Sequence, residues 1–344
     1  MKKRVCFLMG MLMALSVVFV AGCGMAGQDG KSGQGADGGV QTIKVGFGSS
    51  LDTSSGGQGL KKFKELVESK SNGKIKVDLY GDGQLGNDKS MTEALQMGTL
   101  DMTLPSGSPL AEFNKAFLAF DLPFLFDNAS QVDKVITGNS GKEMLASLEV
   151  QNIKGLAYFE NGFRNITNSK HPIQSVADMK GLKLRVMQNP IMIDTFKAWG
   201  ANPTPMAFNE VFTALEQKTI DGQDNPNTLI YDAGFYEAQK YLTLSRHFYT
   251  PYVLIMSKKK WDSFSAEDQK LLQACADEAA EWQRETNRKL DEEYLGRMKE
   301  KGIAVNEIAP EEITKMKEMV KPIYEQYAGQ IGEARLKAIQ SEMQ

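Results

Sequence analysis

Strand and helix patterns alternate along the first part of the chain after position 40. Apolar and polar residues alternate over 42–47 and again over 74–80, and helical patterns follow over 59–69 and 88–97. A short apolar stretch over 100–104 then predicts a third strand. Because strands that are joined by helices pair in parallel, this order predicts an α/β lobe.

The same pattern returns after about residue 160, which predicts a second α/β lobe. Farther along, Ser265 is a predicted N-cap, and apolar residues at spacings of three and four predict a single helix over 266–300. This helix is longer than most helices of globular proteins. The segment 308–344 is predicted to form further helices packed on the outside of the fold.

One predicted strand, over 182–187, carries an arginine suited to binding an anion. Leucine and valine take one face of this strand, and Lys183, Arg185 and Met187 take the other. Arg185 stands near the carboxyl end, where ligands bind in open α/β sheets. A guanidinium stays charged and offers a flat fork of donors that matches a carboxylate. Two interpretations remain open on these grounds: a carboxylate site, or a surface arginine in a salt bridge.

Several motifs in a fixed order relate the chain to a known family. They are Gly83-Gln-Leu-Gly-Asn-Asp88, Gly98-Thr-Leu-Asp101, Asp121-Leu-Pro-Phe-Leu-Phe126, Asn161-Gly-Phe-Arg-Asn-Ile-Thr-Asn168, Gly181-Leu-Lys-Leu-Arg185, Pro205-Met-Ala-Phe208 and Gly222-Gln-Asp-Asn-Pro226. With these motifs the chain resembles the extracytoplasmic solute receptors of tripartite ATP-independent periplasmic (TRAP) transporters, the DctP family. The resemblance covers essentially the whole chain after its N-terminal segment.

The resemblance implies a fold and a partner. The fold would be the two-lobed periplasmic-binding-protein fold, α/β in class, with a long helix that spans both lobes. Lobe I is then predicted over 41–161 and 250–285, and lobe II over 162–249 and 286–344. The partner would be a membrane permease with a small and a large subunit. A receptor of this kind binds its solute and is not an enzyme.

The resemblance also implies roles for single residues. Arg185 would bind the carboxylate of the substrate, Arg164 and Asn225 would donate further bonds, and Phe208 would pack against the carbon skeleton. As the lobes close, Asp88 and Ser106 of the first lobe would bond hydroxyl groups of the ligand. Gln188 is a further predicted ligand-binding residue.

Departures from the family pattern bear on the ligand. Where sialic-acid-binding members carry a glutamate and an arginine, this chain has Ser106 and Pro109, so sialic acid is disfavoured. Asp224 replaces the usual glutamate before Asn225, which could shift that asparagine slightly. We expect a sugar acid such as a hexuronate. Two alternatives stay open: a C4-dicarboxylate whose second carboxylate binds Arg164, and a lipid-anchored enzyme acting on cell-surface sugars.

The first residues indicate where the protein works. A basic start, Lys2-Lys-Arg4, precedes an apolar run, and Val20-Ala-Gly-Cys23 has the form of a lipobox. We therefore predict a lipoprotein signal peptide over 1–22, with lipidation of Cys23 and extracytoplasmic attachment to the cell membrane. A plain signal peptide and a short anchor helix are the alternatives. The glycine-rich stretch 23–40 would serve as a flexible tether.

Composition and motifs disfavour other classes of function. A net charge of −3 argues against nucleic-acid binding. Two histidines exclude a histidine-rich metal site, and the usual motifs of hydrolases are missing. Gly81-Asp-Gly-Gln-Leu-Gly86 fits the dinucleotide fingerprint, but Asp101 begins the next strand instead of ending it. We interpret these glycines as a turn at the cleft edge and predict no cofactor. Cys275 is predicted to be buried, and the protein to be a monomer.

Overall fold

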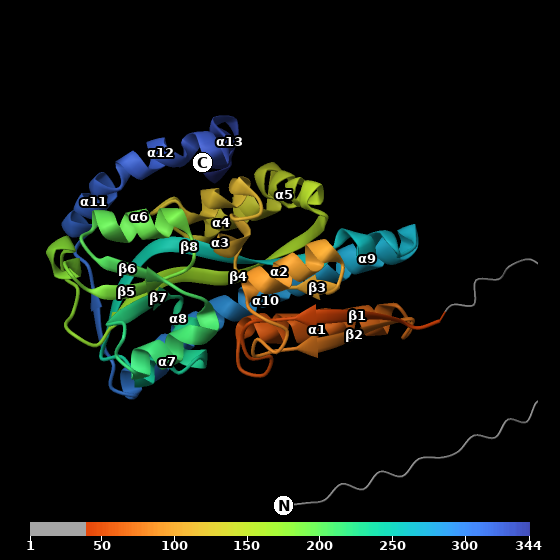
Figure 1. Cartoon of the computed structure of the whole chain (residues 1–344), viewed down its shortest axis with the longest axis horizontal. Coiled ribbons are helices and arrows are strands. Elements are labelled where there is room, and N and C mark those ends of the chain that lie inside the picture. Colours follow the sequence, from red (N-terminus) through yellow and green to blue (C-terminus); the bar gives the residue numbers. More distant parts are fainter. Residues whose placement is uncertain (1–38) are drawn as a thin grey trace, which may run out of the picture. The chain divides into compact units, whose positions relative to one another are not determined.

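A nine-stranded mixed sheet organises residues 39–344, the compact unit that the computed structural model describes (Figure 1). Its order is β2-β1-β3-β8-β4-β7-β5-β6, and β9 pairs with β8. The strands are β1 (Gln41–Gly46), β2 (Ile75–Tyr80), β3 (Met102–Thr103), β4 (Ile153–Asn168), β5 (Lys183–Val186), β6 (Asn202–Pro205), β7 (Gly222–Asn225), β8 (Tyr241–Ser257) and β9 (Ala304–Glu307). The predicted signal peptide, Cys23 and the tether up to residue 38 lie outside the described residues.

Two long antiparallel strands, β4 and β8, link the halves of the sheet. The carboxyl-terminal part of β8 pairs with β3, whereas the carboxyl-terminal part of β4 pairs with β7. The pairing of β4 with β8 shifts by one residue between Glu160 and Gly162, opposite Thr250 and Pro251. Proline has no N–H to donate to the ladder, and it is tolerated at such bulges. The strands therefore change direction where the two halves of the sheet meet.

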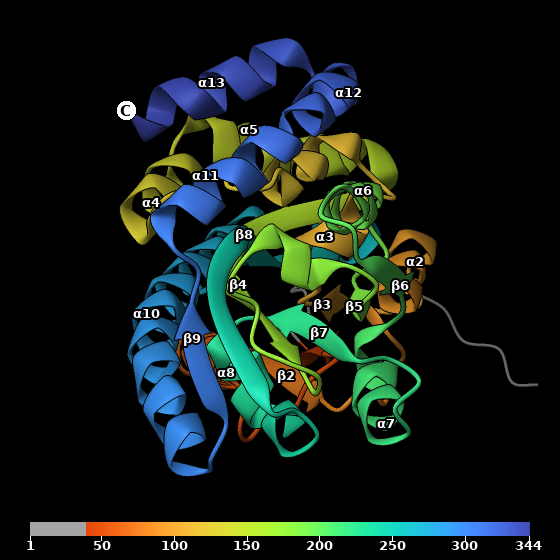
Figure 2. The ribbon, with the colours of Figure 1, turned by 90° about the vertical axis from the view of Figure 1, so that its left-hand side faces the viewer.

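Helices cover both faces of the sheet: α6, α12 and α13 lie on one side, and α7 and α8 on the other (Figures 1 and 2). The α-helices are α1 (Ser55–Lys70), α2 (Asp88–Met97), α3 (Gly107–Leu110), α4 (Ala129–Thr137), α5 (Asn139–Ala146), α6 (Pro190–Ala198), α7 (Val211–Glu216), α8 (Asn227–Asp232), α9 (Lys258–Asp262), α10 (Ala266–Glu300), α11 (Pro310–Met319), α12 (Lys321–Ile331) and α13 (Glu333–Met343). The 3₁₀ helices are η1 (Lys115–Asp121), η2 (Ser147–Gln151), η3 (Val176–Met179), η4 (Phe208–Glu210) and η5 (Phe235–Glu237). None of the helices in residues 39–344 has the length and apolar character that a membrane span needs.

The long helix α10 confirms the prediction for 266–300, with Ser265 Oγ accepting from the Asp268 N–H at its start. Its 35 residues extend over about 52 Å. Leu272 and Cys275 join the apolar cluster that β1, β2 and α1 build, whereas Met298 joins the cluster of α7 and α8. One helix thus packs under both halves of the sheet, as expected for the two-lobed α/β fold. Cys275 is buried, as predicted.

Two predicted elements differ in extent from the structure. Helix α1 begins at Ser55 instead of residue 59, because Ser54 caps it by accepting from the Gly57 N–H at 3.1 Å. Its early glycines lower helix propensity and conceal this start in the sequence. The third strand is only two residues long, although the Val253 N–H still reaches the carbonyl of Pro105. The exact lobe boundaries stay a prediction.

Candidate ligand-binding site

A cleft opens where the loops after β1, β2, β3, β5 and β6 meet. Strands β1, β2 and β3 are parallel to one another, and so are β5, β6 and β7. In each group the carboxyl ends of the strands therefore lie at one edge of the sheet, and the loops that follow them meet there. Asn161 of β4, Asn225 of β7 and Tyr252 of β8 complete the wall.

Arg185 of β5 lines the cleft with only 2% of its surface exposed. Its Nε and Nη2 donate to the carbonyl oxygen of Met206 at 3.1 and 2.9 Å, and Nη1 has no partner. The ion pairs formed within residues 39–344 do not include Arg185. Burial and the neighbouring charge of Arg164 lower the pKa of Arg185 to about 10, so the side chain stays charged at neutral pH. The cleft therefore holds a buried cation without a bonded counter-charge.

Arg164 of β4, the second predicted arginine, is fully buried and does not line the cleft. Its Nε lies 2.6 Å from Oδ2 of Asp224, its Nη2 donates to the carbonyl of Asp224, and its Nη1 has no partner. Burial by itself raises the pKa of Asp224, but Arg164 and His247 outweigh it, and the pKa falls. Asp224 is thus an anion held against Arg164. A direct bond from Arg164 to a ligand stays a prediction.

His247 stands beside this pair, with Nε2 3.4 Å from Oδ2 of Asp224. Burial lowers the pKa of His247 despite the opposing effect of Asp224. The imidazole is therefore neutral at neutral pH. Its Nδ1 is 2.7 Å from the hydroxyl oxygen of Ser245, which lies two residues earlier in β8 and anchors the ring.

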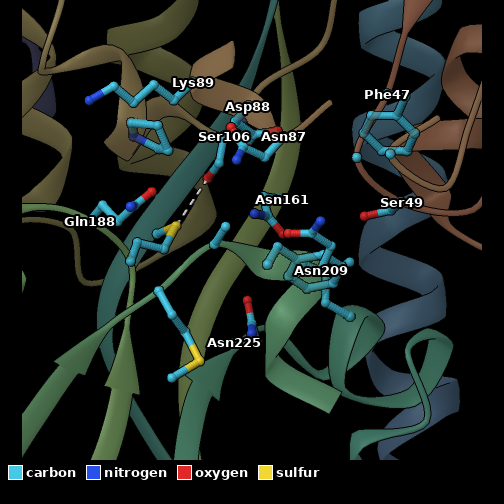
Figure 3. Close-up of a pocket in the computed structure, with 18 of the residues that line it drawn as sticks. Phe47, Ser49, Asn87, Asp88, Lys89, Ser106, Asn161, Gln188, Asn209 and Asn225 are labelled. Carbon is cyan, nitrogen blue, oxygen red and sulfur yellow. Dashed lines mark hydrogen bonds between the residues drawn. The ribbon is translucent and has the colours of Figure 1, made fainter. Parts of the chain in front are cut away.

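Asn225, at the end of β7, lines the cleft and is oriented by a chain of hydrogen bonds. The amide nitrogen of Gln223 donates to Oγ1 of Thr167 at 2.9 Å, which turns Oε1 of Gln223 toward Asn225. The amide nitrogen of Asn225 donates to that oxygen at 2.5 Å. Its own Oδ1 is directed to the cleft (Figure 3). In this orientation Asn225 offers the ligand an acceptor, whereas the sequence interpretation expected a donor.

Phe208 and Gln188 also line the cleft. Phe208 is half-buried, and its ring packs against that of Phe235 with centroids 5.6 Å apart. Gln188 is exposed in the loop that follows β5. The structure thus brings Arg185, Asn225, Phe208 and Gln188 to one cavity, as the sequence predicted for a shared site.

Asp88, the first residue of α2, and Ser106, which follows β3, also line the cleft. The Ser106 N–H donates to Oδ2 of Asp88 at 3.0 Å, and Oγ of Ser106 lies 3.5 Å from Sδ of Met187 (Figure 3). Burial raises the pKa of Asp88 to about 6, although this N–H and the charge of Arg185 oppose the shift. At neutral pH the cleft is therefore lined by two cations, Arg185 and Lys89, of which Lys89 is paired with Glu112, and by one mostly ionised carboxyl.

Sequence reasoning missed several wall residues, namely Ser49, Asn87, Asn161, Asn209 and Tyr252. Ser49 and Asn87 lie in loops that follow predicted strands, a signal that would have justified including them. Asn161 belongs to a quoted motif, but its direction depends on a bulge that only strand pairing reveals.

The glycine-rich turn after β2 contributes Gly83 and Gly86 to the cleft edge. Gly86 has a φ of 122°, where a side chain is strained, and a Cβ there would come within 2.3 Å of Oγ of Ser90. These glycines therefore serve the turn itself. Within residues 39–344, no cluster of three or more histidine, cysteine or acidic side chains is arranged to hold a metal ion.

Comparisons with known proteins identify the family of this chain. The family described as bacterial extracellular solute-binding protein, family 7 (DctP) matches residues 49–330. The 2,3-diketo-L-gulonate-binding periplasmic protein YiaO of Escherichia coli is 38% identical over 266 residues, which are 77% of this chain and 81% of that protein. The C4-dicarboxylate-binding protein DctB of Bacillus subtilis is 34% identical over 267 residues, which are 77% and 76% of the two chains.

A solved structure gives the same result. The sugar acid binding protein DctPAm of Advenella mimigardefordensis, crystallised in complex with galactonate, has a TM-score of 0.86 and 42% sequence identity. The alignment covers 89% of this chain and 98% of that one. Members of this family are transport proteins that bind a substrate and are not enzymes. The chain therefore belongs to the DctP family, the solute-binding proteins of TRAP transporters.

Proposed function

We propose that this protein is an extracytoplasmic receptor that binds a sugar acid, of the hexuronate or a related type, and delivers it to a TRAP permease with a small and a large membrane subunit. The observation that carries this proposal is the state of Arg185. A buried guanidinium with no bonded counter-charge is costly. A ligand carboxylate would supply the missing charge and bond Nη1, the nitrogen that has no partner.

The rest of the cleft favours hydroxyl groups over a second carboxylate. Asn225 presents its Oδ1, and Asp88 presents a carboxyl that is mostly ionised at neutral pH. Both groups accept hydrogen bonds, and hydroxyls donate them. A second ligand carboxylate would have no proton to donate and would be repelled by Asp88. This favours a sugar acid over a C4-dicarboxylate, although relatives bind both kinds of acid.

A thermal-shift titration of the purified protein tests this function. The panel contains galactonate, gluconate, galacturonate, glucuronate, succinate and malate, with neutral glucose as the control. A ligand that binds only the folded state at 100 times its Kd stabilises it by about 2.7 kcal/mol. A rise in Tm with sugar acids, but not with glucose or succinate, is expected. A rise with succinate or malate alone would identify a C4-dicarboxylate receptor instead.

The enzyme alternative is separated by recovering the ligand. After long incubation with the protein, a bound sugar acid should return chemically unchanged, as judged by NMR.

The proposed membrane attachment has its own test. Replacing Cys23 with alanine should move the protein from the membrane fraction to the soluble extracytoplasmic fraction, and persistence in the membrane would contradict lipidation at this residue.

A further inference from the structure

The bulge in β4 turns one side chain out of the ladder. Glu160 pairs with Pro251 and Gly162 pairs with Thr250, so Asn161 has no residue opposite it. Gly162 has a φ of 127°, a conformation that side chains rarely adopt, and this permits the local change of direction. Bulges of this kind re-aim a side chain and are common beside functional sites.

The re-aimed side chain of Asn161 enters the cleft. It is 2% exposed and lines the cavity together with Arg185 and Asn225. Figure 3 shows it between Ser106 on one side and Asn225 on the other. Its Oδ1 has no hydrogen-bond partner among the described residues. A buried carbonyl oxygen normally has a partner, so this one requires an explanation.

Side chains of helix α10 hold the main chain around Asn161 by hydrogen bonds. Asn287 donates to the carbonyl of Asn161 at 3.3 Å. Gln283 accepts from the Glu160 N–H at 2.7 Å and donates to the Glu160 carbonyl at 2.8 Å. The carbonyl of Asn161 and both main-chain groups of Glu160 therefore have partners that do not involve the Asn161 side chain. A group anchored in this way presents its side chain at a set position, as recognition of a specific ligand atom requires.

We infer that Asn161 is a specificity-determining residue whose Oδ1 accepts a hydrogen bond from one hydroxyl group of the bound acid. A hydroxyl supplies the donor that the buried oxygen lacks, whereas a methylene in its place supplies none. Asn161 then rejects acids that lack this hydroxyl, because they leave its oxygen unpaired. This inference rests on the proposed sugar-acid function and adds to it the residue that distinguishes hydroxylated from deoxygenated acids.

The test compares galactonate with its 2-deoxy, 3-deoxy and 4-deoxy counterparts by calorimetry. Wild-type protein should bind galactonate about tenfold or more tightly than one of the deoxy acids, which corresponds to about 1.4 kcal/mol. Asn161→Ala should reduce that preference to about twofold or less, chiefly by weakening galactonate binding. Asn161→Asp keeps an acceptor of the same shape. It should retain the preference while overall affinity falls through charge repulsion.

Asn139→Ala is the matched control, because Asn139 is exposed on α5 and does not line the cleft. It should keep the preference of the wild type. The inference is overturned if Asn161→Ala retains the preference, or if wild-type protein binds galactonate and all three deoxy acids equally. Failure of the wild type to bind any sugar acid would instead overturn the proposed function, and this inference with it. Melting temperatures of all variants establish that each is folded.

Discussion

Arg164 and Asp224 form a fully buried ion pair, with Nε of the arginine 2.6 Å from Oδ2 of the aspartate. This pair neutralises one of the two arginines that the sequence assigned to the ligand. Arg185, which lies close enough to feel the charge of Arg164, has no such partner. The two arginines therefore differ in ion pairing. Arg164 has a bonded counter-charge within the protein, whereas Arg185 has none and can take an external anion.

Replacement of Arg185 should separate binding from stability. Arg185→Met removes the carboxylate partner, and truncating one member of a buried charge pair costs about 2–5 kcal/mol of binding energy. Affinity for the ligand should fall at least about 30-fold. The ligand-free protein should keep or raise its Tm, because a buried cation without a counter-charge has been removed. Calorimetry and thermal unfolding measure the two effects.

Arg185→Lys is the companion variant for this prediction. Lysine keeps the charge but has no planar fork, so it should also bind much more weakly than wild type. Affinity equal to wild type in both variants would contradict the assignment of Arg185 to the ligand carboxylate.

Breaking the Arg164–Asp224 pair should strongly destabilise the fold. Asp224→Asn leaves a buried arginine without its counter-charge, for which a loss of about 3–5 kcal/mol is expected. Urea unfolding measures this loss. The double variant Arg164→Met with Asp224→Leu removes both charges, and it should recover a large part of the stability. A double variant as unstable as the single one would show that the pair is not the cause.

The same pair gives stability a defined pH dependence. The pKa of Asp224 is lower in the folded protein than the unfolded value of about 3.9. Its contribution is therefore fully present above about pH 4 and is lost as the pH falls through the folded pKa. Acid unfolding of Asp224→Asn should lack this component when compared with wild type.

Asp88 should control the discrimination against dicarboxylates. Its pKa of about 6 makes it mostly ionised at pH 8 and mostly protonated at pH 5. Repulsion of a second ligand carboxylate should therefore weaken as the pH falls. The ratio of succinate affinity to galactonate affinity should be higher at pH 5 than at pH 8 in the wild type.

Asp88→Asn isolates this effect from the titration of succinate itself. The variant should raise the relative affinity for succinate at pH 8, and any remaining change with pH should come from the ligand. Identical pH profiles of this ratio for wild type and variant would contradict a role for Asp88 in selectivity.

Gly162 should be sensitive to any side chain. Its φ of 127° is strained for other residues, and a Cβ would lie 3.3 Å from Cβ of Pro226. Gly162→Ala should therefore lower the free energy of unfolding by about 1–3 kcal/mol. Gly181 is a suitable control, because its φ is 80° and a Cβ there meets nothing within 4 Å. Gly181→Ala should cost less, and equal losses would show that crowding at Gly162 adds nothing.

The sequence predicted the elements that local patterns control. Arg185 alternates with apolar neighbours, so its strand and its place on the opposite face could be read directly. Ser265 and the spacing of apolar residues predicted α10 and its approximate bounds. The motifs identified the family and several residues of the cleft. These features depend on neighbours within a few positions, which a single sequence records.

Other features arise from residues far apart in the chain. Asp224 stands 60 positions after Arg164, and their pairing decides which arginine remains available. Asn161 enters the cleft because β4 has one extra residue between the pairs Glu160–Pro251 and Gly162–Thr250. Neither strand specifies this register alone.

The sequence by itself thus determined the family, the α/β fold and the strand that carries Arg185, since periodicity and motifs are local properties. Tertiary structure alone decided which arginine has a bonded counter-charge, the raised pKa of Asp88 and the direction of Asn161. Burial and hydrogen bonding depend on what the folded chain packs around a group, and no stretch of neighbouring residues records that environment.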